Sequence, residues 1–339
     1  MTDSRSIVEK NRDCGFDTLK GLLIFLVVLG HVFDIKKGSM QSVGYLYPII
    51  YSFHMPAFAF VSGYFSKSSN SFEKQSYKAV KTILIPFFIC HVIMWAFASR
   101  SSTELFTPRW SSWYLLCLFV WKIFAIPVSH FRFSLPISFI FALLIGLTPA
   151  EQMLALSRMF SFFPFFLLGY KTTESMIQKY RNTKKIYPLI ILVLASMFII
   201  LLKRYRIPIA EVEKMAGPYN TLGIASNLHG ILYRMLAMII GAVWTICLIC
   251  LVPQKQSILS KLGRTTMTVY LVHPFLVRLS EILINKAVPM LLSNELFILM
   301  FSFGFSILIC VAFGNEWVNT LYNKIIDRIA SILMIDSKK

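Results

Sequence analysis

Long apolar stretches alternate with short polar and basic segments along almost the whole chain. Residues 189–202, for example, contain no charged side chain. A helix rises about 1.5 Å per residue, so about 20 apolar residues cross the roughly 30 Å hydrocarbon core of a bilayer. The pattern therefore predicts an all-α, polytopic membrane protein of about ten transmembrane helices. We expect them near residues 18–36, 44–65, 79–99, 112–128, 133–148, 157–172, 186–203, 229–252, 266–285 and 296–318.

The composition favours one membrane domain over two soluble domains. Of the 339 residues, 56% are apolar and 15% are charged, whereas soluble domains have roughly 45–50% and about 25%. No long polar linker interrupts the apolar pattern. We therefore expect a cytoplasmic N-terminal segment at 1–17, a membrane domain at 18–318 and an amphipathic cytoplasmic helix at 319–339. Apolar residues at helical spacing predict that this last helix lies on the membrane surface.

The basic residues indicate how the chain is oriented. Lys and Arg outnumber Asp and Glu by 34 to 16, for a net charge of +18. They stand in short loops between apolar stretches, which predicts affinity for anionic membrane lipids rather than for nucleic acid. With the N-terminus inside, cytoplasmic segments hold about twice as many Lys and Arg as external ones. Both termini are therefore predicted to be cytoplasmic. The longest external loop, 204–228, is expected to shape an outer binding surface.

Cysteine and metal chemistry is not expected. Five of the six cysteines lie inside apolar stretches, where cysteine behaves as a small hydrophobic side chain. Cys247 and Cys250 form a CxxC pair, but one pair within a membrane helix lacks the further ligands of a zinc site. We predict no metal site.

Three histidines fall inside predicted membrane helices: His31, His54 and His273. Titratable groups are costly at membrane depth and need a partner or a function. His31 follows Lys20 by eleven residues, which places it roughly 16 Å deeper along the first helix. Asp34 lies one turn later and is positioned to accept the second imidazole proton. The alternative for each histidine is a core side chain satisfied by a hydroxyl or a carbonyl.

A second group of basic residues precedes the third predicted helix. Lys78 and Lys81 share one helical face just before the apolar stretch 82–88. Such a face suits the phosphates of an anionic cofactor at the inner surface. Anchoring by the positive-inside rule is the equally simple alternative.

Several short motifs occur in a characteristic order along the chain. They are Asp17-Thr-Leu-Lys20 before Gly30-His31, Phe53-His-Met-Pro56 before Ser62-Gly63-Tyr64, Lys78-Ala-Val-Lys81, Trp113-Tyr114-Leu115 and Tyr270-Leu-Val-His273. Together they resemble the acyltransferase-3 family of membrane acyltransferases. The most similar branch is the fucose 4-O-acetylase-like group of polysaccharide O-acetyltransferases. Lysine stands at Lys20, Lys78 and Lys81 where much of the family has arginine, a better bidentate phosphate ligand.

The resemblance implies an enzyme of the bacterial cytoplasmic membrane. Its donor is acyl-CoA, expected to be acetyl-CoA, on the cytoplasmic side. Its acceptor is a hydroxyl of a cell-surface polysaccharide or of a lipid-linked precursor. We expect His31 to be the general base, with Asp34 orienting it, and Lys20, Lys78 and Lys81 to bind the CoA phosphates.

The remaining site residues are less sharply defined by the sequence. An oxyanion donor is needed, and His54, Arg234 and Arg278 are all possible. Direct transfer and an acyl-histidine relay both remain open. Substrate contacts are expected from Trp113, Tyr114, Arg234, His273 and Arg278, although aromatic residues are also common at membrane interfaces for purely structural reasons.

Two other function classes compete with acyl transfer. A transporter or flippase for an amphiphilic saccharide would use the histidines and arginines along a path, but no repeated halves are visible. A scaffold protein would leave the intramembrane histidines unexplained. For the enzyme, we expect His31, His54, Lys78 and Lys81 to border one continuous cavity that opens to the cytoplasm.

Overall fold

The computed structural model describes residues 12–34, 40–67, 71–98, 106–108, 110–149, 153–287 and 294–335. Within these ranges the regular elements are all helical. The α-helices are α2 (Cys14–Asp34), α3 (Gln41–Tyr64), α4 (Phe72–Ala79), α5 (Ile85–Ala98), α6 (Ser112–Val128), α7 (Ser134–Leu144), α8 (Leu156–Lys171), α9 (Glu174–Arg181), α10 (Ile186–Arg204), α11 (Ile209–Glu213), α12 (Asn227–Leu251), α13 (Ile258–Arg264), α14 (Thr266–Ala287), α15 (Glu295–Phe313) and α16 (Glu316–Leu333). The predicted all-α fold is confirmed.

The apolar helices agree with a polytopic membrane protein. In the described ranges, seven helical segments are long and apolar enough to cross a bilayer. They are Cys14–Asp34, Phe72–Phe97, Met153–Lys171, Ile186–Arg204, Asn227–Leu251, Thr266–Ile284 and Glu295–Phe313. The α6 helix and the segment from α7 to Leu147 are shorter apolar helices. The total of about ten spans, the cytoplasmic termini and the three-part domain division stay predictions.

Three short helices were not expected from the apolar pattern. These are α9, α11 and α13, which occupy segments that were predicted to be loops. Side-chain caps stabilise the starts of two of them: Thr173 accepts from the Met176 amide, and Ser257 forms a capping box with Ser260. Similarly, α4 begins seven residues before the predicted start because Ser71 caps it. Such helices depend on caps and packing rather than on length.

The third membrane segment runs from α4 into α5 through a π-helical turn, Val80–Leu84. Pro86 follows this turn. A proline lacks a backbone N–H, and its ring clashes with the carbonyl four residues earlier, which here falls inside the turn. The wider π-turn accommodates the proline without breaking the helix.

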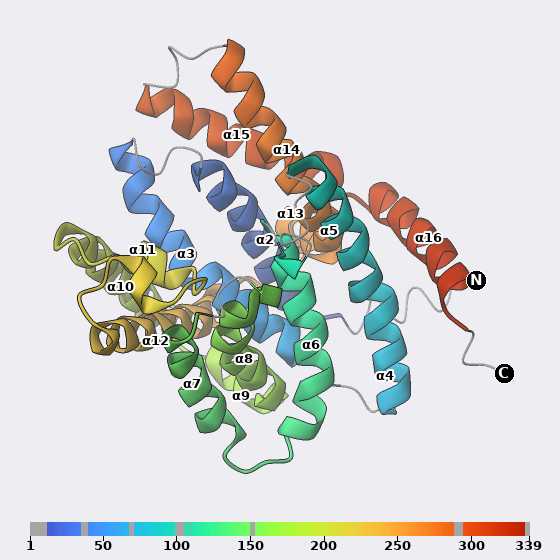
Figure 1. Ribbon diagram of the computed structural model, residues 1–339, viewed down its shortest axis with the longest axis horizontal. Helices are drawn as coiled ribbons and strands as arrows, with labels where there is room; N and C mark the ends of the chain where they lie inside the picture. Colours follow the sequence, from blue (N-terminus) through green and yellow to red (C-terminus); the bar gives the residue numbers. More distant parts are fainter. Residues whose placement is uncertain are drawn as a thin grey trace.

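The α2 helix occupies the centre of the bundle. Figure 1 shows α2 beside α3, with α10, α11 and α12 on one side and α4, α5 and α16 on the other. Of its most apolar window, 72% is buried, against 17% for α10. A helix that is apolar all round and buried belongs in a core, whereas α10 turns side chains such as Leu194 and Met197 outward to lipid. Residues of α2 are therefore the best placed to form an internal site.

Close backbone contact joins α3 to α8. A Cβ built on Gly63 would lie 1.9 Å from the Phe166 carbonyl oxygen, and one on Gly169 would lie 2.0 Å from the Phe60 carbonyl oxygen. Only glycine fits at these two positions. Without a hydrophobic driving force between helices in lipid, such small-residue contacts allow the close packing that holds membrane helices together. This contact fixes α3, which carries His54, against α8.

Substitution Gly63→Ala is expected to destabilise the bundle. The added methyl group overlaps a backbone oxygen, so α3 and α8 must separate. This lowers the free energy of unfolding by about 1–3 kcal/mol. Thermal unfolding of the purified protein measures this as a lower midpoint temperature. The matched control is Gly304→Ala in α15, where an added Cβ meets no atom within 4 Å. Equal midpoints for the two variants would contradict the packing described here.

Candidate active site

A cavity of about 220 Å³ lies beside the C-terminal part of α2, and we call it the histidine cavity. Its polar lining comes from five helices and two connecting segments: His31, Asp34, Tyr51, His54, Ser111, Arg158, Glu213, Lys214 and Tyr270. The predicted catalytic residues His31, Asp34 and His54 are therefore brought to one place. Trp113, a predicted substrate contact, lines the same cavity.

His31 lies in the last turn of α2 and is partly accessible. Its ring faces the ring of His273, with 5.2 Å between centroids. Asp34 accepts a hydrogen bond from the Tyr47 hydroxyl at 3.0 Å, and its carboxylate lies 3.9 Å from Nζ of Lys214. The negative charge of Asp34 lies one turn from the His31 imidazole. It therefore stabilises the positively charged form of that ring during proton transfer.

Backbone carbonyls determine which nitrogen carries the proton in the other two histidines. Nδ1 of His54 lies 2.7 Å from the Ile50 oxygen, and Nδ1 of His273 lies 3.2 Å from the Val269 oxygen. A carbonyl can only accept, so Nδ1 is the protonated atom in each ring. The Nε2 atom of each neutral ring then accepts hydrogen bonds and cannot donate them. Neutral His54 is consequently unsuited to be the oxyanion donor.

Arg158 of α8 contributes a positive charge to the histidine cavity, a role that the sequence did not predict. Its guanidinium lies 4.8 Å from the centre of the Trp113 ring, and its Nε donates to the Lys214 carbonyl at 3.4 Å. In the part of the chain that the structure describes, Arg158 forms no ion pair with a carboxylate. The one indication of this role in the sequence is that a single arginine stands at the edge of an apolar stretch.

Glu213 was also missed, because it lies in the predicted loop 204–228. It ends α11, is 3% exposed and lines the histidine cavity. Burial raises the pKa of its carboxyl well above the ordinary value.

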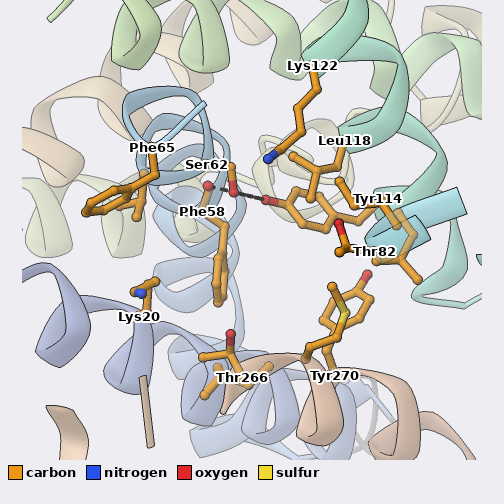
Figure 2. A pocket seen from close by; sticks show the side chains of 15 residues that line it. Lys20, Phe58, Ser62, Phe65, Thr82, Tyr114, Leu118, Lys122, Thr266 and Tyr270 are labelled. Carbon is orange, nitrogen blue, oxygen red and sulfur yellow. Dashed lines mark hydrogen bonds between the residues drawn. The ribbon is translucent and has the colours of Figure 1, made fainter. Parts of the chain in front are cut away.

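A second cavity, of about 280 Å³, begins beside Lys20 and is called the Lys20 cavity. Figure 2 shows Lys20 of α2 and Lys122 of α6 on different sides of it, around a mostly apolar lining. The predicted substrate contact Tyr114 lines this cavity rather than the histidine cavity; its hydroxyl is 2.8 Å from the Ser62 hydroxyl. Tyr270 lines both cavities. The two cavities therefore adjoin at this residue.

Three cations share one buried carboxylate near the Lys20 cavity. Asp17 is 2% exposed and lies 2.6 Å from Arg12, 2.6 Å from Lys20 and 3.8 Å from Arg264. One negative charge cannot balance three positive ones, so this cluster keeps an excess of positive charge. We call these four residues the Asp17 cluster. A cation-rich cluster at the end of a cavity suits an anionic ligand.

Lys78 and Lys81 do not line either cavity. Lys78 is exposed on α4, and Lys81 lies 2.9 Å from Asp327 of α16. The expectation that both lysines border one cavity with His31 and His54 is wrong for the lysines. The physical reason is that α16, which the sequence reading placed on the membrane surface, supplies an acidic partner for Lys81.

Arg234 and Arg278 are likewise outside both cavities. Arg234 is fully buried and donates to the Gly217 carbonyl at 3.0 Å, with weaker contacts to Ala142 and Ser161. Arg278 is exposed and pairs with Glu281 one turn later. The structure does not support substrate contact by these two residues, because both guanidinium groups are already engaged by the protein. His273 is fully buried and contacts the site through the rings of His31 and Tyr270.

Among the described residues, no group of three or more His, Cys, Asp or Glu side chains is arranged to hold a metal ion. The polar groups of the two cavities instead suit acid–base chemistry and the binding of a charged ligand.

Comparison with known proteins gives a family and two relatives. The family model of the acyltransferase-3 domain, described as an acyltransferase domain, matches residues 15–315. Nodulation protein NolL of Mesorhizobium japonicum is 26% identical over 181 residues, which cover 47% of this chain and 48% of that protein. NolL of Sinorhizobium fredii is 32% identical over 194 residues, covering 51% and 52%. The chain thus spans about half the length of the curated relatives it matches. No solved structure matches it significantly.

Thiol labelling tests the different accessibility of the two facing histidines. In a Cys14→Ser background, where the other native cysteines are buried, a small methanethiosulfonate reagent should modify His31→Cys and leave His273→Cys unmodified. The reason is that His31 faces the cavity, whereas His273 is 0% exposed. Mass spectrometry of the intact protein gives the modified fraction. Equal labelling of both variants, with unchanged thermal unfolding, would contradict this arrangement.

Proposed function

Because the chain belongs to the acyltransferase-3 family, we propose that it transfers an acetyl group from acetyl-CoA to a saccharide hydroxyl. The donor binds in the Lys20 cavity and the acceptor in the histidine cavity. The supporting observation is that a cavity with two lysines and a cavity with two histidines adjoin at Tyr270. The acceptor belongs to a bacterial surface polysaccharide or its lipid-linked precursor. The enzyme acts in the cytoplasmic membrane, with the Lys20 cavity facing the cytosol.

The charges near Lys20 support an acyl-CoA donor. The phosphates of CoA carry several negative charges, which the excess positive charge of the Asp17 cluster attracts. The apolar lining of the cavity suits the uncharged arm of CoA, and Lys122 provides a further cation part-way along it. In this arrangement the phosphates stay at the inner end of α2, and only the thioester approaches His31. About 16 Å of helix separates Lys20 from His31.

His31 is the proposed general base. Its imidazole takes the proton of the attacking hydroxyl while the oxygen bonds to the thioester carbonyl carbon. The carbon–sulfur bond then breaks, and the imidazolium returns the proton to the CoA thiolate. Asp34 stabilises the imidazolium. Direct transfer is favoured over a relay because the two cavities adjoin and neither substrate needs to cross the membrane.

Arg158 is the proposed oxyanion donor, in place of His54, Arg234 and Arg278. It is a permanent cation, it lines the cavity of His31, and no carboxylate neutralises it among the described residues. A charge aimed at the developing oxyanion in a site of low polarity is typically the largest contribution to such catalysis.

Replacing His31 tests the base. His31→Ala should lower acetylation of the glycan by about 10²–10⁴-fold, the usual contribution of a general base. The measurement is base-labile acetate on surface polysaccharide isolated from cells that make equal amounts of each variant. His130→Ala is the control, because His130 is exposed and lies outside both cavities. Normal acetylation with His31→Ala would remove the assignment. A transporter would not consume acetyl-CoA at all.

Replacing Lys122 tests the donor cavity. Lys122→Met keeps most of the length of the side chain but removes the charge, and it should raise the KM for acetyl-CoA about tenfold with little change in kcat. A charge-assisted hydrogen bond is worth about 1.5–3 kcal/mol, enough for such a change. Steady-state release of CoA by the purified protein provides the measurement. Lys179→Met is the matched control, since Lys179 is exposed on α9 and lines neither cavity. A larger effect from Lys78→Met would favour the original assignment of that residue.

A further inference from the structure

Glu213 is a buried carboxyl with no assigned partner. It is 3% exposed, and neither of its carboxyl oxygens has a hydrogen-bond partner among the described residues. Asp17 is equally buried, yet three cations surround it. Leaving a buried carboxyl unpaired is costly. In this respect Glu213 differs from Asp17, the other buried acid among the described residues. The difference is that Glu213 lines the histidine cavity.

The neighbouring charges do not neutralise Glu213. Lys214 follows it and lines the same cavity, but its Nζ lies 3.9 Å from Asp34 and over the Tyr47 ring. The Arg158 guanidinium lies over Trp113. The rest of the titratable lining is His31, His54, Tyr51 and Tyr270. An isolated carboxylate in such surroundings takes up a proton. A protonated carboxyl both donates and accepts hydrogen bonds, as a hydroxyl group does.

The fold holds this carboxyl in place without using it. Ser157 donates to the Met215 carbonyl at 2.9 Å, and Arg158 donates to the Lys214 carbonyl. Arg234 donates to the Gly217 carbonyl. The backbone directly after Glu213 is therefore fixed by α8 and α12, while both carboxyl oxygens remain available. Positioned but unused hydrogen-bonding groups are a feature of binding sites.

We propose that Glu213 binds the acceptor, by hydrogen bonding to a sugar hydroxyl next to the one that reacts at His31. This inference rests on the proposed function and assigns part of its acceptor site. The cavity of about 220 Å³ suits one sugar ring of the acceptor. Trp113 offers an apolar ring face in the same cavity. Because the Glu213 carboxyl would bind one hydroxyl while a neighbouring one reacts, the proposed site selects a neutral sugar ring with adjacent hydroxyls.

Two substitutions separate hydrogen bonding from packing. Glu213→Met keeps approximately the volume but cannot form strong hydrogen bonds, whereas Glu213→Gln keeps one donor and one acceptor. Since no protein partner is lost, Glu213→Met should leave the thermal midpoint unchanged or raise it. It should nevertheless raise the KM for the acceptor at least tenfold, while Glu213→Gln stays within about threefold of the unmodified protein. A structural role predicts the reverse, a lower midpoint with unchanged acceptor KM.

The experiment uses purified full-length protein in nanodiscs, labelled acetyl-CoA, and unacetylated surface polysaccharide from host cells lacking the gene. The KM for acetyl-CoA should stay within twofold in both variants, because Glu213 does not line the Lys20 cavity. Glu73→Ala, an exposed change on α4, is the control. An unchanged acceptor KM with Glu213→Met, or an equal rise in the KM for acetyl-CoA, would overturn the inference.

A binding measurement keeps this test separate from acyl transfer itself. The same polysaccharide should raise the thermal midpoint of the unmodified protein and of Glu213→Gln, but not that of Glu213→Met. If the unmodified protein consumes no acetyl-CoA, the proposed function fails, and this binding difference still decides the role of Glu213. An equal shift in all three proteins would contradict it.

Discussion

A buried polar group inside a membrane bundle needs a partner, and this constraint organises the whole structure. In an apolar interior an unpaired charge is far more costly than in water. The chain satisfies most of its buried charges internally: Asp17 lies among three cations, and Arg234 donates to the Gly217 carbonyl. Residues that break this rule are therefore informative. Both Glu213 and Arg158, which lack a charged partner in the described ranges, line the cavity of His31.

The central position of α2 connects the two ends of the proposed reaction. One continuous helix carries Lys20 near its start and His31 in its last turn, so their separation is set by helix geometry rather than by loops. The Gly63 and Gly169 contacts in turn hold α3, with His54, against α8, with Arg158. A site built on packed helices keeps its geometry more exactly than one built on loops, because α2, α3 and α8 cannot shift independently.

Much of the fold can be predicted from the lengths of the apolar stretches in the sequence. Much of the site cannot be predicted in this way. The spans and the shared cavity of His31 and His54 could be foreseen, since helix depth places histidines at similar levels. The contacts of Arg234 and Lys81 could not be foreseen, because their partners come from other segments of the chain. Arg234 donates to the Gly217 carbonyl, and Lys81 pairs with Asp327. Glu213 was hidden for the same reason. A residue in a long polar loop gives no sign that the loop folds back and buries it.

The two cavities differ in the charged groups around them, and this difference matters for the proposed transfer of an acyl group. Around Lys20 the protein keeps an excess of cations over one carboxylate, which suits a ligand whose charge stays at the surface. Around His31, the groups with no hydrogen-bond partner among the described residues include the Glu213 carboxyl, the Ser111 hydroxyl and Nε2 of His273. Burial raises the pKa of the Glu213 carboxyl, which favours its neutral form. Neutral hydrogen-bonding groups stabilise hydroxyls and repel no charge. In the proposed reaction, the uncharged acyl group moves from the first environment to the second, while the charged part of the donor stays in the first.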